Sequence, residues 1–140
     1  VTLHESSAEA LSTISPSRAA VMQAEGIAIE TYEVQATTLH HLLTLHHFVE
    51  PNHEGVIDLI SIDTEATSHE TLRGARIDYW KPRVVLIECF TVEERQSIAG
   101  QMEAAGCILS VINATENYLF VRDAEDVEQM QEAAREQSIA

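Results

Sequence analysis

The sequence is poor in positive charge, in aromatic side chains and in cysteine. Lys and Arg total 8 against 23 Asp and Glu, so the formal net charge is −15. Such a charge repels phosphate backbones and anionic lipid surfaces, which argues against nucleic acid and membrane partners. Aromatic residues make up 5% of a chain that is 45% hydrophobic, so aliphatic side chains must form most of the core.

Long apolar runs are also missing. No stretch is long enough to span a bilayer, and no charged start followed by an apolar run resembles a signal peptide. The two cysteines, Cys89 and Cys107, stand in separate apolar runs, which favours buried reduced thiols over a disulfide or a metal pair. We therefore expect a cytoplasmic protein. The first residue is Val rather than Met, which suggests that the chain begins inside a longer reading frame.

A chain of 140 residues is long enough for one domain with a single core. We expect residues 1–124 to form this domain. The remaining segment, 125–140, is polar nearly all round and is typical of an exposed helix or tail.

Hydrophobic periodicity predicts an alternation of strands and helices in the first part of the domain. Pro16 would interrupt a helix in the Ser-rich stretch around it, so we expect a loop there. Thr91 and Glu94 have the spacing of a capping box, which marks the start of a helix. The expected elements are a strand at 1–3, a loop at 5–17, a strand at 27–34, a helix at 38–48, a strand at 56–62, a helix at 69–75, a strand at 84–87 and a helix from 91 to about 105.

Two further strands, at 107–113 and 117–122, are separated by only three residues, a spacing that predicts an antiparallel hairpin. Strands joined by helices instead favour parallel pairing with right-handed crossovers. The sequence therefore predicts an α/β fold in which a parallel sheet ends in an antiparallel hairpin.

The most specific motif begins with I-D-L-I-S-I-D-T-E at residues 57–65, continues with E-T-L-R-G-A at 70–75, and ends with K-P-R-V-V-L-I-E at 81–88. This motif resembles the signature of the FkbM methyltransferase family, which reads I-D-x-E-G, then E-x-L-x-G-A, then P-x-V-I-x-x-E. Upstream, S-T-I-S at 12–15 and Val34 with T-L-H-H-L-L at 38–43 resemble the family's S-T-L-S and V-x-x-x-T-L-D-x-L-L segments. Downstream, N-Y-L-F-V-R at 117–122 is similar to the family's closing strand.

The resemblance implies an S-adenosylmethionine-dependent methyltransferase that acts on a hydroxyl of a sugar or other small metabolite. It also implies a partial class I methyltransferase sheet of the Rossmann-like type. In that arrangement the chain corresponds to the carboxyl-terminal half of the family domain, and the amino-terminal strands that bind the methyl donor are missing.

Three acids are the candidate site residues. Asp63 and Glu65 follow one predicted buried strand and Glu88 ends the next, and ligands of open α/β sheets bind outside such strand ends. By the resemblance, Asp63 and Glu65 are catalytic, as acceptor-positioning groups or base, and Glu88 binds substrate. A positioned carboxylate suits this role because the acceptor must be oriented and deprotonated. The alternative is structural: Asp63 caps the following helix and Glu88 makes an edge contact.

Three positions depart from the family pattern. Ala66 replaces the glycine of I-D-x-E-G, Ser68 replaces the next acid, and His40 replaces the aspartate of T-L-D. Because Ala disfavours positive φ, we expect the loop after Glu65 to be reshaped.

The Gly-rich turn D-x-G-A-N-x-G, which by the resemblance cradles the donor, is absent. Five glycines are scattered, at positions 26, 55, 74, 100 and 106, and none follows a predicted strand in that pattern. We expect this chain alone to bind S-adenosylmethionine poorly and to need the missing amino-terminal half of the domain as its partner.

Histidines crowd one span, at positions 40, 41, 46, 47 and 53. Zinc needs three or four converging ligands, which adjacent pairs on different helix faces do not supply, so we expect no metal site. Two other readings remain open: a non-catalytic, degenerate or partner-completed methyltransferase-like module, and a His-rich metal-binding domain.

Overall fold

The computed structural model describes residues 1–8, 11–45, 57–112 and 116–128. Its elements run in the order β1 (Thr2–Ser6), α1 (Pro16–Ala24), β2 (Ile29–Glu33), α2 (Leu39–Leu45), β3 (Leu59–Ile62), α3 (Ser68–Ala75), α4 (Ile77–Trp80), β4 (Val84–Glu88), α5 (Val92–Ala104), β5 (Ile108–Ile112) and β6 (Asn117–Val121). The chain is thus of the mixed α/β class, as the sequence predicts.

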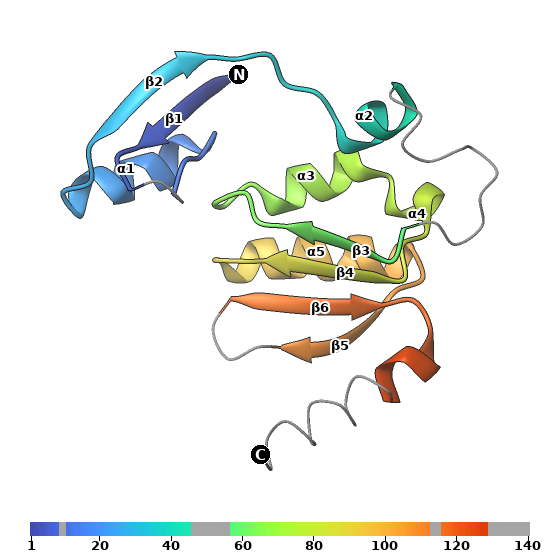
Figure 1. Ribbon diagram of the computed structural model, residues 1–140. Helices are drawn as coiled ribbons and strands as arrows, with labels where there is room; N and C mark the ends of the chain where they lie inside the picture. Colours follow the sequence, from blue (N-terminus) through green and yellow to red (C-terminus); the bar gives the residue numbers. More distant parts are fainter. Residues whose placement is uncertain (9–10, 46–56, 113–115, 129–140) are drawn as a thin grey trace, which may run out of the picture.

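The main sheet has four strands in the order β3-β4-β6-β5 (Figure 1). β3 and β4 are parallel, with Ile60 opposite Val85, which confirms the predicted pairing of the two buried strands. β6 runs antiparallel to both β4 and β5. The predicted closing hairpin is therefore confirmed, although its connection at 113–115 lies outside the described residues.

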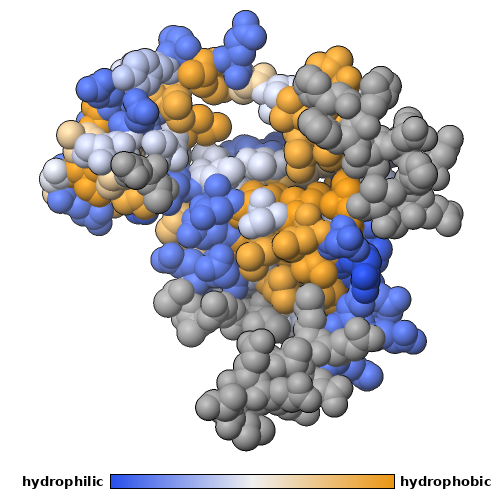
Figure 2. Space-filling view, viewed as in Figure 1, coloured by the Kyte–Doolittle hydropathy of each residue, from blue (hydrophilic) through white to orange (hydrophobic). Residues whose placement is uncertain are grey.

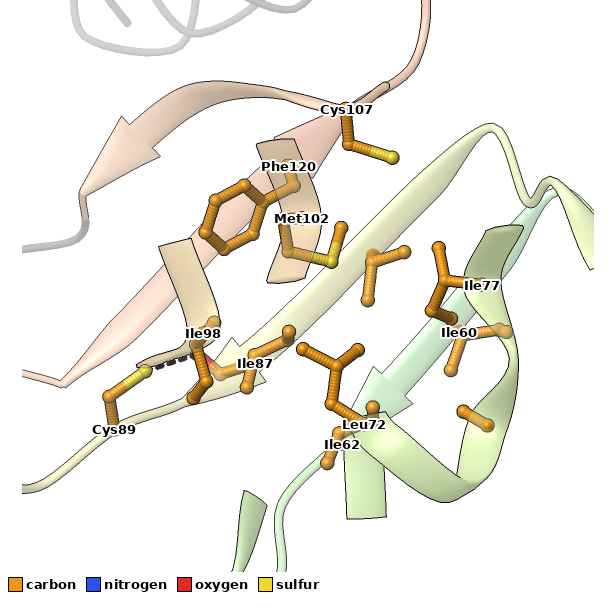
Figure 3. Packing of buried hydrophobic residues seen from close by; sticks show 12 residues of the cluster. Ile60, Ile62, Leu72, Ile77, Ile87, Cys89, Ile98, Met102, Cys107 and Phe120 are labelled. Atoms are coloured by element: carbon orange, nitrogen blue, oxygen red, sulfur yellow. Dashed lines mark hydrogen bonds between the residues drawn. The ribbon is translucent and has the colours of Figure 1, made fainter. Parts of the chain in front are cut away.

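One face of this sheet carries the core. Side chains that alternate along the strands, such as Ile60, Val85 and Phe120, are buried under α3 and α5. Leu72 from α3 and Met102 from α5 meet them there (Figure 3). The core is almost wholly aliphatic, as the shortage of aromatic residues requires.

The opposite face of the sheet is not covered by a helix of the described part of the chain (Figure 1). Leu59 is 57% exposed on it, and its neighbours Val84, Leu86 and Leu119 are only half-buried. Figure 2, in the same view, shows hydrophobic side chains gathered over this face. Parallel strands are usually buried on both faces, so this surface is unusual for the fold.

The first part of the chain forms a separate unit, in which β1 and β2 pair as an antiparallel ribbon beside α1. The expected loop at 5–17 is wrong at both ends. β1 extends to Ser6, and Pro16 begins α1 instead of interrupting a helix. The reason is that the first helical turn needs no proline N–H, and the Ser15 hydroxyl caps the helix by accepting from the Arg18 N–H at 3.3 Å.

Helix boundaries elsewhere follow local rules. The Thr91 hydroxyl accepts from the Glu94 N–H at 3.0 Å and so caps α5. α3 ends at Arg76, whose backbone is in the left-handed region, with φ 56. A Cβ on Gly74 would lie 3.1 Å from the Thr38 methyl group, so this glycine permits close packing next to α2. The predicted helix at 38–48 is seen as α2, which begins at Leu39, and residues 46–48 lie outside the described part. In the segment 125–140, for which a helix or tail was expected, residues 125–128 belong to a helix that begins at 124, and the remaining residues lie outside the described part.

Candidate functional site

The three acids singled out from the sequence come together at one edge of the sheet. Asp63 and Glu65 follow β3, Glu88 ends β4, and the two strands run side by side in the same direction. Each acid offers a carboxylate oxygen, and these oxygens all lie within 4.8 Å of one another. We call this group the acid cluster. Asp63 is exposed, Glu88 half-buried and Glu65 buried, so the acids differ in what they can reach.

The pKa of Glu88 lies far above the ordinary range of a carboxyl group. Burial raises its pKa first, and hydrogen bonding to Asp63 and the nearby negative charges of Asp63, Glu65 and Glu116 raise it further, to about 8. Its Oε2 atom is buried and has no hydrogen-bond partner in the described residues. Burial and the neighbouring acids thus both favour the protonated form of Glu88.

Glu65 is held by contacts from the first unit of the chain. The Arg18 Nε–H donates to its Oε2 at 3.1 Å, and the carboxylate side chain is only 9% exposed. The Thr13 hydroxyl donates to the backbone carbonyl of Glu65 at 2.6 Å. Sequence reasoning missed both partners. The only available signal was the S-T-I-S segment, which contains Thr13 and directly precedes α1.

In the loop after β3, Ala66 adopts the left-handed backbone conformation that we expected an alanine to avoid. Glu65 has φ 48 and Ala66 has φ 72, so the loop is left-handed at both residues. Side chains pay a steric penalty in this region. The contacts from Thr13 and Arg18 over-determine the conformation and so offset the strain.

The alternative role for Asp63 does not match the structure. The residue that precedes α3 is Thr67, and it makes no side-chain cap. Instead the carboxylate of Glu94, which is buried, accepts from the Ser68 N–H at 3.2 Å and from the Phe90 N–H at 3.0 Å. Glu94 therefore serves the starts of two helices, and Asp63 stays free of capping.

A hollow with a volume of about 300 Å³ lies beside the same loop. Hydroxyl groups, a histidine and carboxylates line it: Ser15, Ser17, Ala66, His69, Thr91, Glu93, Glu94 and Ser97. The side chains of this lining include several hydrogen-bond donors and acceptors.

The histidines do not gather around an ion in the part of the chain that the structure describes. His40 packs against the rings of Tyr79 and Trp80, with centroids 5.4 and 5.6 Å away. His46, His47 and His53 lie outside the described residues. In the described part, the group of side chains suited to a cation is the acid cluster, whose oxygens are the ligands that hard divalent cations prefer.

Comparison with known families agrees with the motif and the fold. The model of the FkbM methyltransferase domain matches residues 3–133. The chain belongs to the FkbM methyltransferase domain family. No curated protein and no solved structure matches it.

The two cysteines of this FkbM-family chain agree with the prediction from the sequence. Cys89 and Cys107 are both buried, free thiols, as predicted. None of the helices in the described residues combines the length and the apolar character that crossing a membrane requires.

Proposed function

We propose that this chain is the acceptor-side part of an S-adenosylmethionine-dependent methyltransferase that methylates a hydroxyl group of a sugar or other small metabolite. The observation that carries the proposal is the side-by-side placement of Asp63 and Glu88 at the carboxyl edge of two parallel strands in a chain of the FkbM family. That edge is where open α/β sheets bind their ligands.

The acids divide the work by exposure. Asp63 is exposed and is proposed to accept a hydrogen bond from the acceptor hydroxyl and then its proton. Glu65 is proposed to complete the catalytic pair by fixing the loop that carries Asp63. Glu88 is proposed to bind substrate, since its protonated carboxyl group can donate to an acceptor oxygen near neutral pH. The hydroxyl-rich hollow beside the loop supports a polyhydroxylated acceptor.

The donor itself does not fit the described residues. Gly26 and Gly106 follow the ends of α1 and α5, and Gly74 and Gly100 lie within helices, so none forms a strand-to-helix turn of the donor-binding kind. Gly55 lies outside the described part. We therefore propose that a donor-binding part with its own Gly-rich turn completes the site and covers the uncovered face of the sheet. In the alternative hypothesis, the chain is a non-catalytic, degenerate or partner-completed methyltransferase-like module.

The test compares the 140-residue chain with a version extended by the coding sequence upstream of Val1. We expect calorimetry to show negligible S-adenosylmethionine binding by the former and clear binding by the latter. In the extended protein, Asp63→Ala or Glu65→Ala should lower turnover on the order of 100-fold and leave donor affinity nearly unchanged. Tight donor binding by the 140-residue chain would contradict the division of the site, and unimpaired turnover in both variants would remove the proposed catalytic pair.

A further inference from the structure

The side chain of Arg18 reaches from α1 to two other segments of the chain. Its guanidinium group lies 4.7 Å from the centroid of the Phe90 ring and donates to Glu65 at 3.1 Å. Phe90 follows β4 and Glu65 follows β3, so one side chain from α1 contacts both strand ends that present the acid cluster. Its side chain is 22% exposed, and the ring and the carboxylate together fix it.

The positive charge of Arg18 lies beside the negative charge of the acid cluster. Three carboxyl groups converge within 4.8 Å in a chain with only 8 Lys and Arg. Proteins commonly balance such a group with a bound divalent cation. Here Arg18 already supplies a positive charge, and it supplies it to the most buried of the three acids.

The backbone contact from Thr13 works in the same direction. It is buried and holds the carbonyl of Glu65, while Arg18 holds the carboxylate. Main chain and side chain of Glu65 are therefore both tied to the first unit, across a left-handed turn that would otherwise relax. This arrangement turns Glu65 toward α1 and leaves Asp63 exposed.

We infer that Arg18 is a positioning residue that takes the place of a metal ion in the acid cluster: it binds Glu65 and leaves Asp63 and Glu88 to face the acceptor. The role toward the acceptor rests on the proposed methyl transfer. The replacement of a metal ion does not, because it concerns only contacts within this chain.

Divalent cations and Arg18 would compete for the carboxylate of Glu65. A divalent ion would have to displace Arg18 to gain Glu65 as a ligand, so the unmodified chain should bind Mn²⁺ weakly. Arg18→Gln removes the competing charge and should tighten Mn²⁺ binding by about ten-fold or more, measured by electron paramagnetic resonance of the free ion. Arg18→Lys keeps the charge and should restore weak binding. Arg76→Gln removes one positive charge from an exposed pair with Asp78 and serves as the matched control, with affinity unchanged.

Equal Mn²⁺ affinity in Arg18→Gln and Arg76→Gln would overturn the inference, and so would tight binding by the unmodified chain that Asp63→Asn abolishes. If Arg18→Gln fails to fold, NMR of the unmodified chain tests the contact: the Arg18 Nε–H must exchange with water more slowly than that of the exposed Arg73, and equal rates would contradict a fixed contact with Glu65. These measurements use no donor or acceptor, so a failure of the proposed methyl transfer would leave them unchanged.

Discussion

The carboxyl groups of Asp63 and Glu88 meet at the ends of two neighbouring parallel strands, with oxygens within 4.8 Å. The pKa of Glu88 is raised to about 8, first by burial and then by its hydrogen bond to Asp63 and the charge of Asp63. The acid cluster thus contains a carboxyl group that remains a hydrogen-bond donor at neutral pH, next to an exposed carboxylate that can accept.

This raised pKa makes stability depend on pH. In the unfolded chain, Glu88 ionises once the pH exceeds its ordinary pKa of 4.5. In the folded chain, the carboxyl group keeps its proton up to about pH 8. Rising pH therefore lowers the free energy of unfolding across this pH window, and this loss of stability is complete above the pKa of the folded chain. Glu88→Gln removes the titration, so its melting temperature should exceed that of the parent chain increasingly between about pH 5.5 and about pH 8.5.

Thermal unfolding followed by circular dichroism measures this difference. The lowest pH of this range stays above the pI of 4.6, because the loss of net charge near the pI promotes association. Glu93→Gln removes an exposed carboxylate outside the acid cluster and controls for the lost charge. A constant difference between Glu88→Gln and the parent at all pH values would contradict the raised pKa.

Ala66→Gly should stabilise the chain by about 1 kcal/mol, because Ala66 adopts φ 72, a conformation that costs a side chain about that much. The same substitution at Ala99, on the exposed surface within α5, should destabilise it by about 1 kcal/mol. Urea unfolding measures both. Destabilisation by Ala66→Gly would show that the loop is not left-handed in solution.

Glu94→Ala should destabilise the chain by about 2 kcal/mol or more, since it leaves the buried N–H of Ser68 and the partly buried N–H of Phe90 without their charged acceptor. Glu93→Ala, one residue earlier and exposed, should change stability little. Chemical unfolding of the two variants tests the assignment. Similar losses in both would mean that the Glu94 carboxylate is not an acceptor at the starts of α3 and α5.

Adjacent positions on β3 should respond in opposite ways. Ile60 is buried under the helices and Leu59 is 57% exposed on the other face. Ile60→Ala should therefore lower the free energy of unfolding by about 3 kcal/mol. Leu59→Ala should change it by no more than about 0.5 kcal/mol in the 140-residue chain. In the extended protein, Leu59→Ala should become costly if the donor-binding part covers this face. Equal costs of Leu59→Ala in the two proteins would argue against that cover.

Much of the main sheet was predictable from local pattern. The runs that became β3 and β4 are short, rich in branched apolar residues and joined by helices, and such runs usually pair as parallel neighbours. Their pairing is enough to bring Asp63 and Glu88 to one edge. The start of α1 at Pro16 was also available in principle, since Ser15 followed by proline is a helix-start signal.

The sequence by itself determined the identity of the strands, their direction and the edge at which the three acids gather, because these depend on hydrophobic period and on the order of elements. Only the tertiary structure decided what each acid does there. Arg18 lies 47 residues before Glu65, and no local pattern connects them. The left-handed shape at Ala66 likewise opposes the local preference of alanine and persists because contacts from a distant segment hold the neighbouring Glu65.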